Sequence, residues 1–363
     1  MKRIIIHYPF KIDRNRKSAS QIRPIKILDT FRNLGYEVDL IEGYGKDRTA
    51  QIKKIKQNIR DGVKYDFVYS ESSTNPTQLT EKNHFPLYPF LDFGFFSFCK
   101  ENNIPIGLFY RDIYWCFSEN INNMKMRVAR LFHRYDIRKY NELLTHLFVP
   151  SREMIKHVPV PVTIPITELY SGCIPIANMP VYNSKSNKLN VLYVGGIGHH
   201  YDLSMFMKVV QQCPDVEFTL CCRLDDWEQV KHEYEMFLSN GNIHVVHKSG
   251  DELKQLYSNA DLFCLFVEPD KYREFAVPFK LFETVGYACP IIASEGTWVA
   301  RYVRENGIGM ISKFDAESLK TNIQELINDR EMLKKYKMRI KEIIPDNTWE
   351  ARCKTIDRIL RNN

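Results

Sequence analysis

A basic and an acidic side chain stand three residues apart near the start of a predicted helix in segment 273–294, REFAVPFKLFETVGYACPIIAS. Pro278 suits the first turn of a helix, which places Lys280 in that turn and Glu283 on the same side. A lysine there opposes the positive end of the helix dipole, and an anionic ligand would relieve that conflict. Glu283 can accept hydrogen bonds from both hydroxyl groups of a ribose. The alternative is an ordinary amphipathic helix, but the pattern favours a binding site.

Three glycines interrupt the sequence YVGGIGHHYDL (193–203) between a predicted strand and a predicted helix. The backbone N–H groups of Gly195, Gly196 and Gly198, together with the helix N-terminus, can hold a phosphate. The spacing is not G-x-G-x-x-G and no acidic residue follows ~20 positions later to hold a ribose, so a dinucleotide site is weakly supported. The alternative is a tight turn that requires a positive φ.

A third candidate, Arg223, ends a predicted strand in CCRLDDW (221–227). A guanidinium group at the end of a strand can bind a diphosphate through two parallel hydrogen bonds. The alternative is a surface arginine that pairs with Asp225 or Asp226. By itself the local sequence favours this second interpretation.

Signals for strands and helices alternate along the first half of the chain. The opening KRIIIHY is typical of a buried strand, a helical spacing of apolar residues follows at 22–35, and YEVDLIE at 36–42 is again a strand. This succession is the repeating unit of parallel α/β sheets. It continues with helices predicted at 49–60, 88–101 and 124–145 and strands at 66–70, 105–110 and 146–151.

A second series begins after segment 178–188, whose Pro, Asn, Ser and Lys content is typical of a linker. Its strands are nearly continuous apolar runs, as expected when helices cover both faces of a sheet. The sequence therefore predicts an α/β protein with two tandem Rossmann-like, doubly wound domains that face each other across a cleft. We predict one domain over 1–180, joined by a C-terminal helix at 347–363 that crosses back to it, and another over 185–346.

Length and composition limit the class of protein. The 363 residues suit two cores of about 150–180 residues each. A content of 44% hydrophobic and 26% charged residues excludes a disordered chain. No apolar run approaches the ~18–20 residues of a membrane span, and we expect no signal peptide in MKRIIIHYPF. The nine cysteines form no C-x-x-C pair and no zinc spacing, so we expect buried thiols in a cytoplasmic protein.

The positive charge is concentrated in the first half of the chain. Residues 1–182 contain 27 Lys and Arg against 18 Asp and Glu, whereas residues 183–363 contain 24 against 26. The helix predicted in 124–140 carries six cations and one acid, a pattern typical of an element that lies on an anionic membrane. The alternative is a solvated helix face. Its apolar side is predicted to consist of Met126, Ala129, Leu131, Phe132 and Ile137.

Taken together, these segments resemble the GT-B fold of nucleotide-sugar glycosyltransferases, and in particular the large retaining family 4 of bacterial surface polysaccharide assembly. Besides the glycine loop and Arg223, the matching segments are ELKQLYSNADLFCLFVEP, the run PFKLFE followed by CPIIAS, and NTWEARCKTIDRIL of the C-terminal helix. SASQIRPIKILDTFRNLGYEVDLI matches the first helix and second strand of the acceptor domain. The resemblance covers nearly the whole chain in organisation and is motif-specific over its second half.

The resemblance implies a role for each candidate residue. Arg223 and Lys280 would grip the diphosphate of the donor and stabilise charge as the sugar–phosphate bond breaks, while Glu283 would bind the ribose. The E-x7-E motif of the family places its first Glu at Phe275, where the nearest acid is Glu274, which becomes the candidate contact to the donor sugar. The remaining donor-binding candidates are Gly195, Gly196, Gly198 and Pro278.

A further catalytic candidate lies in the first domain. Asp112, in LFYRDIYW, occupies a position where relatives carry a His-Asp pair that faces the sugar, and Arg111 here replaces the His. The alternative for Asp112 is a helix cap or a partner of Arg111. No Asp-x-Asp ends a predicted strand, so the Arg/Lys pair would take the place of a metal, and we predict neither a metal nor a cofactor.

The resemblance therefore implies a retaining, metal-independent glycosyltransferase. It would move a sugar from a nucleoside-diphosphate sugar to a growing, lipid-linked glycan such as capsule or O-antigen. The helix predicted in 124–140 would contact the anionic membrane surface. One alternative is a nucleotide-sugar epimerase of the same fold, although no convincing set of acid and base carboxylates is present. Another is a basic nucleic-acid-binding protein, but the chain has no recognised reader motif, so we expect no nucleic-acid partner. A catalytically silent scaffold is the third, and the candidate donor-site residues together argue against it.

Overall fold

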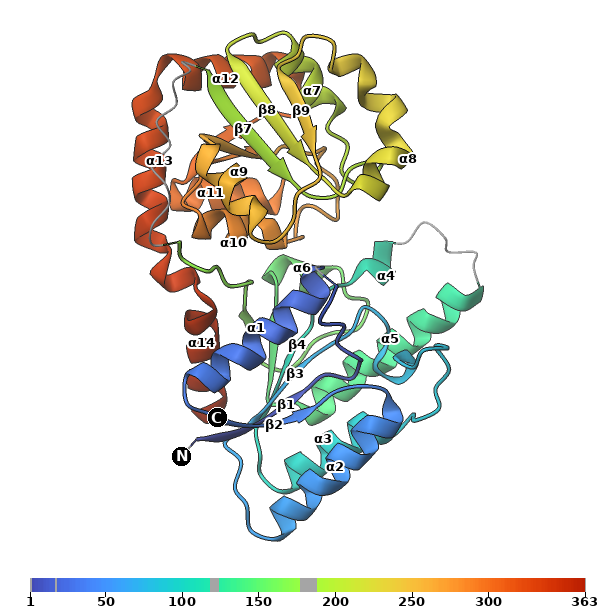
Figure 1. Cartoon of the computed structure of the whole chain (residues 1–363). Coiled ribbons are helices and arrows are strands. Elements are labelled where there is room, and N and C mark those ends of the chain that lie inside the picture. The colour runs from blue at the N-terminus through green and yellow to red at the C-terminus, as the bar shows by residue number, and fades with distance from the viewer. Residues whose placement is uncertain (1, 17, 118–123, 177–187, 363) are drawn as a thin grey trace. The chain divides into compact units, whose positions relative to one another are not determined.

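The computed structural model describes residues 2–16, 18–117, 124–176 and 188–362. The chain divides into two compact units, Met1–Ser171 with Trp349–Asn363 and Gly172–Thr348, called here the first and second unit (Figure 1). Each contains a six-stranded parallel sheet, so the predicted α/β fold with two doubly wound sheets is confirmed. The first unit ends at Ser171, earlier than the 180 that the sequence suggests, and the predicted linker 178–188 lies, apart from Lys188, outside the described residues.

The first unit has the strand order β2-β1-β3-β4-β5-β6. Its strands are β1 (Arg3–His7), β2 (Glu37–Ile41), β3 (Val68–Glu71), β4 (Ile106–Phe109), β5 (His146–Val149) and β6 (Ile166–Glu168). Its helices are α1 (Ala19–Asn33), α2 (Gly45–Arg60), α3 (Leu91–Glu101), α4 (Tyr114–Phe117), α5 (Met124–Leu143), α6 (Arg152–Lys156) and α14 (Trp349–Arg361), with a 3-10 turn η1 (Thr77–Leu79). Figure 1 shows α1 and α14 on one side of this sheet and α2, α3 and α5 on the other.

The last helix, α14, packs in the first unit although some 180 residues separate it from the rest of that unit. Its Cys353 thiol lies 3.8 Å from the carbonyl oxygen of Ile27 in α1. Its Leu360 side chain occupies space beside β4, where a Cβ atom at Gly107 would come within 2.8 Å of it. The glycine in β4 therefore leaves room for the helix, which returns to the first unit as the sequence predicts.

The second unit has the strand order β12-β11-β10-β7-β8-β9. Its strands are β7 (Leu189–Val194), β8 (Val216–Cys221), β9 (Ile243–Val246), β10 (Leu262–Leu265), β11 (Ile291–Ser294) and β12 (Gly309–Ser312). Its helices are α7 (Ser204–Gln211), α8 (Leu224–Tyr234), α9 (Glu252–Asn259), α10 (Phe279–Gly286), α11 (Trp298–Asn306), α12 (Ala316–Asn328) and α13 (Arg330–Ile343), with 3-10 turns η2 (Glu235–Phe237) and η3 (Pro345–Asn347).

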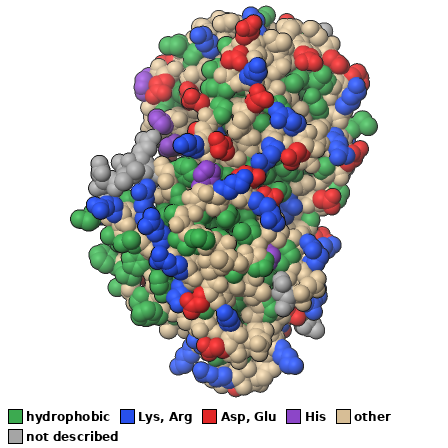
Figure 2. All heavy atoms as spheres, turned by 180° about the vertical axis from the view of Figure 1, so that it is seen from behind, with side chains coloured by type: hydrophobic (Ala, Val, Ile, Leu, Met, Phe, Trp, Pro, Cys, Tyr) green, Lys and Arg blue, Asp and Glu red, His purple; other side chains and the backbone are tan. Residues whose placement is uncertain are grey.

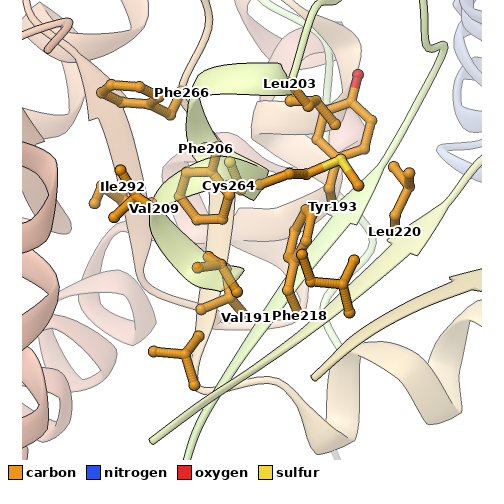
Figure 3. Packing of buried hydrophobic residues seen from close by; sticks show 14 of the residues in the cluster. Val191, Tyr193, Leu203, Phe206, Val209, Phe218, Leu220, Cys264, Phe266 and Ile292 are labelled. Carbon is orange, nitrogen blue, oxygen red and sulfur yellow. The ribbon is translucent and has the colours of Figure 1, made fainter. Parts of the chain in front are cut away.

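The core of the second unit forms where α7 packs on the central strands. Phe206 of α7 is fully buried and lies 5.0 Å from the ring of Phe218 in β8 and 6.1 Å from that of Phe266 after β10. Figure 3 shows these rings with Val191 and Cys264 around them. All nine cysteines are free and eight of them are buried, which matches the expected apolar role. Within the described residues, no helix is both long and apolar enough to cross a membrane.

Some elements of the second unit are absent from the sequence predictions. The strand β12 begins with Gly309, a residue that sequence rules associate with loops. A Cβ atom at this position would lie only 1.9 Å from the carbonyl oxygen of Ile291, so the close pairing of β12 with β11 requires glycine. The helix α13 could not be predicted from an apolar spacing, because most of its residues are exposed and charged and only Leu333 and Ile340 are buried.

A buried carboxyl group lies in the first unit, on α5. Asp136 is only 3% exposed, and its Oδ2 accepts a hydrogen bond of 2.8 Å from the backbone N–H of Thr77 in η1. Its Oδ1 has no hydrogen-bond partner among the described residues. Burial raises the pKa of Asp136 to about 7, an effect that the nearby Asp92 reinforces and the Thr77 hydrogen bonds oppose.

Asp136 should make the stability of the protein depend on pH. Because its pKa is raised in the folded state, its contribution is fully present below its unfolded pKa of about 4 and is lost as the pH rises through about 7. The variant Asp136→Asn has no titrating group at this position and does not lose this stability. The difference in free energy of unfolding, variant minus unmodified protein, should therefore increase from pH ~5 to ~8. Urea unfolding at several pH values measures the difference. Asp61→Asn, at an exposed position, is the control for the substitution itself. A difference for Asp136→Asn that stays constant with pH would contradict the assignment.

Candidate functional site

In each sheet the chain reverses its direction of strand addition at one point. In the second unit β8 and β9 follow β7 on one side, whereas β10, β11 and β12 lie on the other. Open α/β sheets bind ligands outside the carboxyl ends of their strands at such a switch point. The two loops there are 195–203, after β7, and 266–278, after β10. We call these loops and the start of α10 the switch-point site.

Lys280 and Glu283 form an ion pair in the switch-point site. The Lys280 Nζ and Glu283 Oε2 atoms are 2.6 Å apart, and the two side chains are 29% and 23% exposed. Pro278 is the N-cap of α10, one position earlier than predicted, and Lys280 lies in the first turn. Because the dipole at this helix end is positive, Glu283 stabilises a cation that would otherwise be unfavourable. The site thus presents a half-exposed cation and a carboxylate side by side.

The charges of the Lys280–Glu283 pair affect the pKa of two neighbouring side chains, Cys221 and Tyr287. Burial raises the pKa of the Cys221 thiol at the end of β8, and the Lys280 ammonium partly offsets this. Burial also raises the pKa of Tyr287 to about 12, and the Glu283 carboxylate adds to that shift. The charged groups of the pair thus influence the pKa of side chains at the end of β8 and at the end of α10.

Arg223 follows the same strand and caps α8. Its side chain is 76% exposed, and its Nε donates a hydrogen bond of 2.9 Å to Asp226 Oδ2. This is the surface pair that the sequence left open as an alternative. Exposed pairs of this kind contribute little to stability. The guanidinium follows β8 at the predicted edge and is bound to Asp226, so its predicted contact to a diphosphate, shared with Lys280, stays a prediction.

The glycine loop after β7 is tied back to the sheet. The N–H of Gly195 donates to the Cys221 carbonyl (3.0 Å), and the Tyr193 hydroxyl donates to the Gly196 carbonyl (2.6 Å). Gly198 has φ 110° and closes a tight turn in which the N–H of Tyr201 donates to its carbonyl (2.6 Å). The tight turn proposed as the alternative from sequence is therefore present at Gly198, at the switch point.

Arg273 joins the two loops of the switch-point site and was not singled out from the sequence. Its guanidinium bonds to the carboxylate of Asp270 and to the backbone carbonyl of His200 in the glycine loop. Its own carbonyl accepts the N–H of Trp298 at the start of α11 (2.8 Å). One arginine thus holds the loops after β7, β10 and β11 together. Nothing in the local sequence distinguishes it from a surface arginine.

Glu274 lies next to Arg273 in a turn at 271–275 and is exposed. Its N–H donates to the Asp270 carbonyl (3.1 Å). Phe275, which stands where the family motif has its first Glu, is 2% exposed and packs against Tyr272 with ring centroids 5.1 Å apart. The chain therefore presents Glu274, and not residue 275, at the surface of this loop.

Replacing Gly195 by alanine is expected to disturb the switch-point site. The added Cβ atom would lie 2.7 Å from the Tyr193 hydroxyl, so the hydrogen bond from Tyr193 to Gly196 must break or the loop must move. Loss of about one hydrogen bond corresponds to a roughly tenfold weaker binding of a nucleotide sugar. Calorimetric titration measures it against Gly94→Ala, since a Cβ at Gly94 meets nothing within 4 Å. Equal affinities of the two variants would rule out a role for this loop.

In the first unit a buried charge network occupies the end of β3. Glu71 is fully buried, and its Oε1 lies 3.2 Å from Arg23 Nε while its Oε2 lies 3.3 Å from Arg111 Nη2. The Tyr69 hydroxyl donates to Glu71 Oε1 (2.8 Å), and Arg23 stacks 3.6 Å from the ring centre of Phe109. Burial lowers the pKa of the Arg111 guanidinium and Glu71 opposes that effect. The Glu71 carboxylate thus balances the charge of two guanidinium groups, those of Arg23 and Arg111.

Asp112 follows Arg111 between β4 and α4 and is partly buried. Its Oδ1 accepts a hydrogen bond of 2.6 Å from the N–H of Ile113, just before the first residue of α4. Arg111 pairs with Glu71 and bonds to the Ser20 carbonyl (3.2 Å), so it is Glu71 that balances its charge. Of the two alternatives for Asp112, the structure thus favours a helix-start contact over a pair with Arg111.

Within the parts of the chain that the structure describes, no group of three or more His, Cys, Asp or Glu side chains could hold a metal ion. The independence from metal therefore stays a prediction. Its basis is the Arg/Lys pair expected from the sequence.

Solved structures share this architecture over the whole chain. Anabaena HepE in complex with UDP has 12% identity and a TM-score of 0.67, with 100% of both chains covered. Sucrose-phosphate synthase of Thermosynechococcus elongatus has 13% identity and a TM-score of 0.64, covering 100% of this chain and 99% of that one. WaaG, a glycosyltransferase involved in lipopolysaccharide biosynthesis, has 13% identity and a TM-score of 0.63, covering 99% and 100%. At these identities the likeness establishes the GT-B fold.

Sequence comparison identifies the family. No curated protein sequence matches the chain. The family model described as glycosyl transferases group 1 matches residues 176–362, which is more than half of the chain and includes the switch-point site. The chain therefore belongs to the glycosyl transferases group 1 family and is a GT-B glycosyltransferase.

Proposed function

We propose that this glycosyltransferase transfers a sugar from a nucleoside-diphosphate sugar to a lipid-linked glycan, with retention of configuration and without a metal ion, in the assembly of a bacterial surface polysaccharide. The observation that carries the donor part is the Lys280–Glu283 pair at the first turn of α10, at the switch point of the second sheet. HepE, which has the same fold, has been solved with UDP and with UDP-glucose. A nucleoside diphosphate suits a site that offers a cation for its phosphates and a carboxylate for its ribose.

Each donor-site residue has a proposed contact. Lys280 binds the diphosphate, and Arg223 joins it after exchanging its Asp226 partner for a phosphate oxygen, since its exposed side chain is free to turn. The N–H groups proposed to face the same phosphates are those of Gly196 and Gly198, since the N–H of Gly195 donates to the Cys221 carbonyl. Glu283 accepts the ribose hydroxyl groups, and Glu274 contacts the sugar from the loop that Arg273 holds in place.

The reaction is a single displacement at the anomeric carbon. An acceptor hydroxyl oxygen bonds to that carbon as the bond from the carbon to the donor phosphate oxygen breaks, and the nucleoside diphosphate leaves with the electron pair. Attack from the leaving-group face retains the configuration, and the departing phosphate oxygen takes the proton of the acceptor hydroxyl. Lys280 and Arg223 stabilise the negative charge that develops on the diphosphate, which is the largest contribution expected of the protein.

The acceptor is assigned to the first unit. Glu71 is the last residue of β3, and Arg111 and Asp112 follow β4, so all three lie at the carboxyl edge where an α/β sheet binds its ligands. WaaG, which acts in lipopolysaccharide biosynthesis, has the same fold. A lipid-linked acceptor also accounts for a basic helix in this unit, and implies a cytoplasmic enzyme at the inner face of the plasma membrane.

The proposal is tested by measuring nucleoside diphosphate released from UDP-, GDP-, dTDP- and ADP-sugars with and without membrane extract containing lipid-linked glycans. We expect one donor to be consumed and its release to rise with the extract, also in the presence of a chelator. NMR of the product should give the anomeric configuration of the donor. Transfer that stops with chelator, or an inverted product, would contradict the metal-free or the retaining part, and transfer to a soluble glycan alone would contradict the lipid-linked part.

A further inference from the structure

Six large apolar side chains are exposed in two segments of the first unit. Segment 85–90, which leads into α3, contributes Phe85 (64% exposed), Leu87 (61%) and Phe90 (75%). The helix α5 contributes Met124 (74%), Val128 (42%) and Leu131 (64%). Concentrations of exposed apolar surface of this kind mark interaction sites, whereas single exposed residues do not.

The two segments are neighbours. Met124, Val128 and Leu131 follow the i, i+4, i+7 spacing of one helix face, and Tyr135 continues it by one turn. The Tyr135 ring packs edge-on against Phe93 of α3, with centroids 5.7 Å apart. Phe90 lies three residues before Phe93 on the same face, and α3 packs against α5, so we infer that segment 85–90 ends next to the apolar stripe of α5.

The backbone of segment 85–90 is held so that these side chains point outward. Gln78 Nε2 donates to the Pro89 carbonyl (2.7 Å), and the Phe90 carbonyl accepts the N–H of Gly94 (2.8 Å). Just upstream, Glu81 Oε1 accepts the N–H of Gly45 (2.6 Å), which anchors the segment to α2. The aromatic residues that fill the core are Phe93, Phe95 and Phe96 on α3. The aromatic run in 84–98 thus separates into a buried and an exposed set.

Arginines border the apolar stripe on α5. Arg127, Arg134 and Arg138 are exposed and lie along one side of it. None of the three forms an ion pair with another described residue. In Figure 2 a row of Lys and Arg side chains runs beside a group of hydrophobic ones, below the grey residues at the edge of the molecule.

This arrangement differs from the helix expected from sequence. Ile137 is buried, and the buried side of α5 is formed by His133, Asp136, Ile137, Tyr140 and Leu143. Of the apolar side predicted from sequence, only Leu131 is largely exposed. Arg130 is partly buried and its Nε donates to the Trp115 carbonyl (3.0 Å), so it is not available to a partner in the same way as Arg134.

We propose that Phe85, Leu87, Phe90, Met124, Val128 and Leu131, together with Arg127, Arg134 and Arg138, form a bilayer-docking face. The apolar side chains enter the boundary between headgroups and acyl chains, and the arginines bind the phosphates of anionic lipids. A bilayer matches this face better than a protein partner does. Its acyl chains accept the apolar side chains, and its anionic headgroups provide a continuous negative charge for the arginines beside them. This proposal rests on the proposed function, since a lipid-linked acceptor is the reason for the enzyme to bind a membrane. Docking can nevertheless be measured without sugar transfer.

Vesicle co-sedimentation of the full chain tests the proposal with two variants. The apolar variant is Phe85→Ser/Leu87→Ser/Phe90→Ser, and its matched control, Met236→Ser/Met338→Ser, changes equally exposed side chains of the second unit. The charge variant is Arg127→Gln/Arg134→Gln/Arg138→Gln, and its control, Lys335→Gln/Lys337→Gln/Lys341→Gln, removes the same charge from exposed positions of α13.

The unmodified protein should bind vesicles with about 30 mol% phosphatidylglycerol at about 0.1 M salt and bind phosphatidylcholine vesicles more weakly. The apolar variant should bind both about tenfold less, and the charge variant should lose only the preference for the anionic vesicles. Both controls should bind like the unmodified protein. Donor binding should persist in all four variants, whereas Lys280→Ala should still bind vesicles, which separates docking from donor chemistry.

Three results would overturn the proposal. One is the absence of vesicle binding by the unmodified protein. Another is equal binding by a face variant and its control. The third is a dimer in sedimentation equilibrium that only the apolar variant disrupts, which would show that a second copy of the chain covers this face.

Discussion

Replacement of Lys280 by alanine should lower turnover by about 10²–10³-fold, the effect of losing one group that stabilises transition-state charge. Lys280 is proposed to face the leaving diphosphate from the first turn of α10, where its side chain is still 29% exposed. The loss should appear mainly in kcat, since the charge on the diphosphate grows as the sugar departs. Removal of Lys280 also leaves Glu283 unpaired at the same helix end, which should weaken binding of the dianionic donor further.

Steady-state release of nucleoside diphosphate measures the effect of Lys280→Ala. Lys254→Ala is the matched control, because Lys254 also forms an i,i+3 pair, with Asp251 (2.8 Å), but is 57% exposed on α9. Circular dichroism should give the same spectrum for both variants. If Lys280→Ala retained the turnover of the control, Lys280 would not stabilise the leaving group and the assignment of the donor site would be wrong.

Replacement of Glu71 by glutamine should destabilise the first unit by about 3–5 kcal/mol, the cost of removing one partner from a buried ion pair. Glu71 is fully buried and is the shared partner of Arg23 and Arg111. Arg23 is itself only 4% exposed, and Glu71 is the carboxylate with which it pairs, while its Nη1 donates to the neutral Tyr170 carbonyl (3.0 Å). The variant leaves two buried guanidinium groups without a counter-charge, while the side-chain volume is unchanged.

Thermal unfolding followed by circular dichroism tests the role of Glu71. A midpoint lower by roughly 6–20 °C is expected for a unit of this size. The control is Glu37→Gln, since Glu37 is 47% exposed and pairs with Arg3 across 3.1 Å at the surface of the same sheet. That variant should lose less than about 1 kcal/mol. Similar midpoints for the two variants would show that Glu71 does not hold the network together.

The two sheets could be predicted from sequence because both are parallel and covered by helices on both faces. The strands β1, β7 and β10 are short apolar runs in sequence, and their central residues are almost fully buried. The strand β12 could not be predicted in this way. Gly309 is required because the Ile291 carbonyl group leaves no room for a side chain, and local sequence preferences do not reveal such a contact. The same holds for α5, whose charge is evident in sequence but whose exposed stripe depends on which face packs against α3.

The candidate site could be predicted where spacing along one helix determines contact. Lys280 and Glu283 are three residues apart on α10, and their pairing follows from helical geometry. Arg273 could not be predicted, because its bond to the His200 carbonyl joins residues 73 positions apart in the chain. Arg223 is an intermediate case, since its position at the end of β8 follows from the sequence but its pairing with Asp226 was one of two alternatives.

Saturation-transfer NMR of the purified protein with a mixture of UDP-, GDP-, dTDP- and ADP-sugars tests the proposed donor site most directly. We predict saturation of one nucleotide by the unmodified protein, and its loss in both Lys280→Ala and Glu283→Ala. The control Lys254→Ala should give the signal of the unmodified protein. No saturation of any nucleotide by a folded protein, or saturation that persists in both site variants, would contradict the assignment of a nucleotide-sugar site to the switch point of the second sheet.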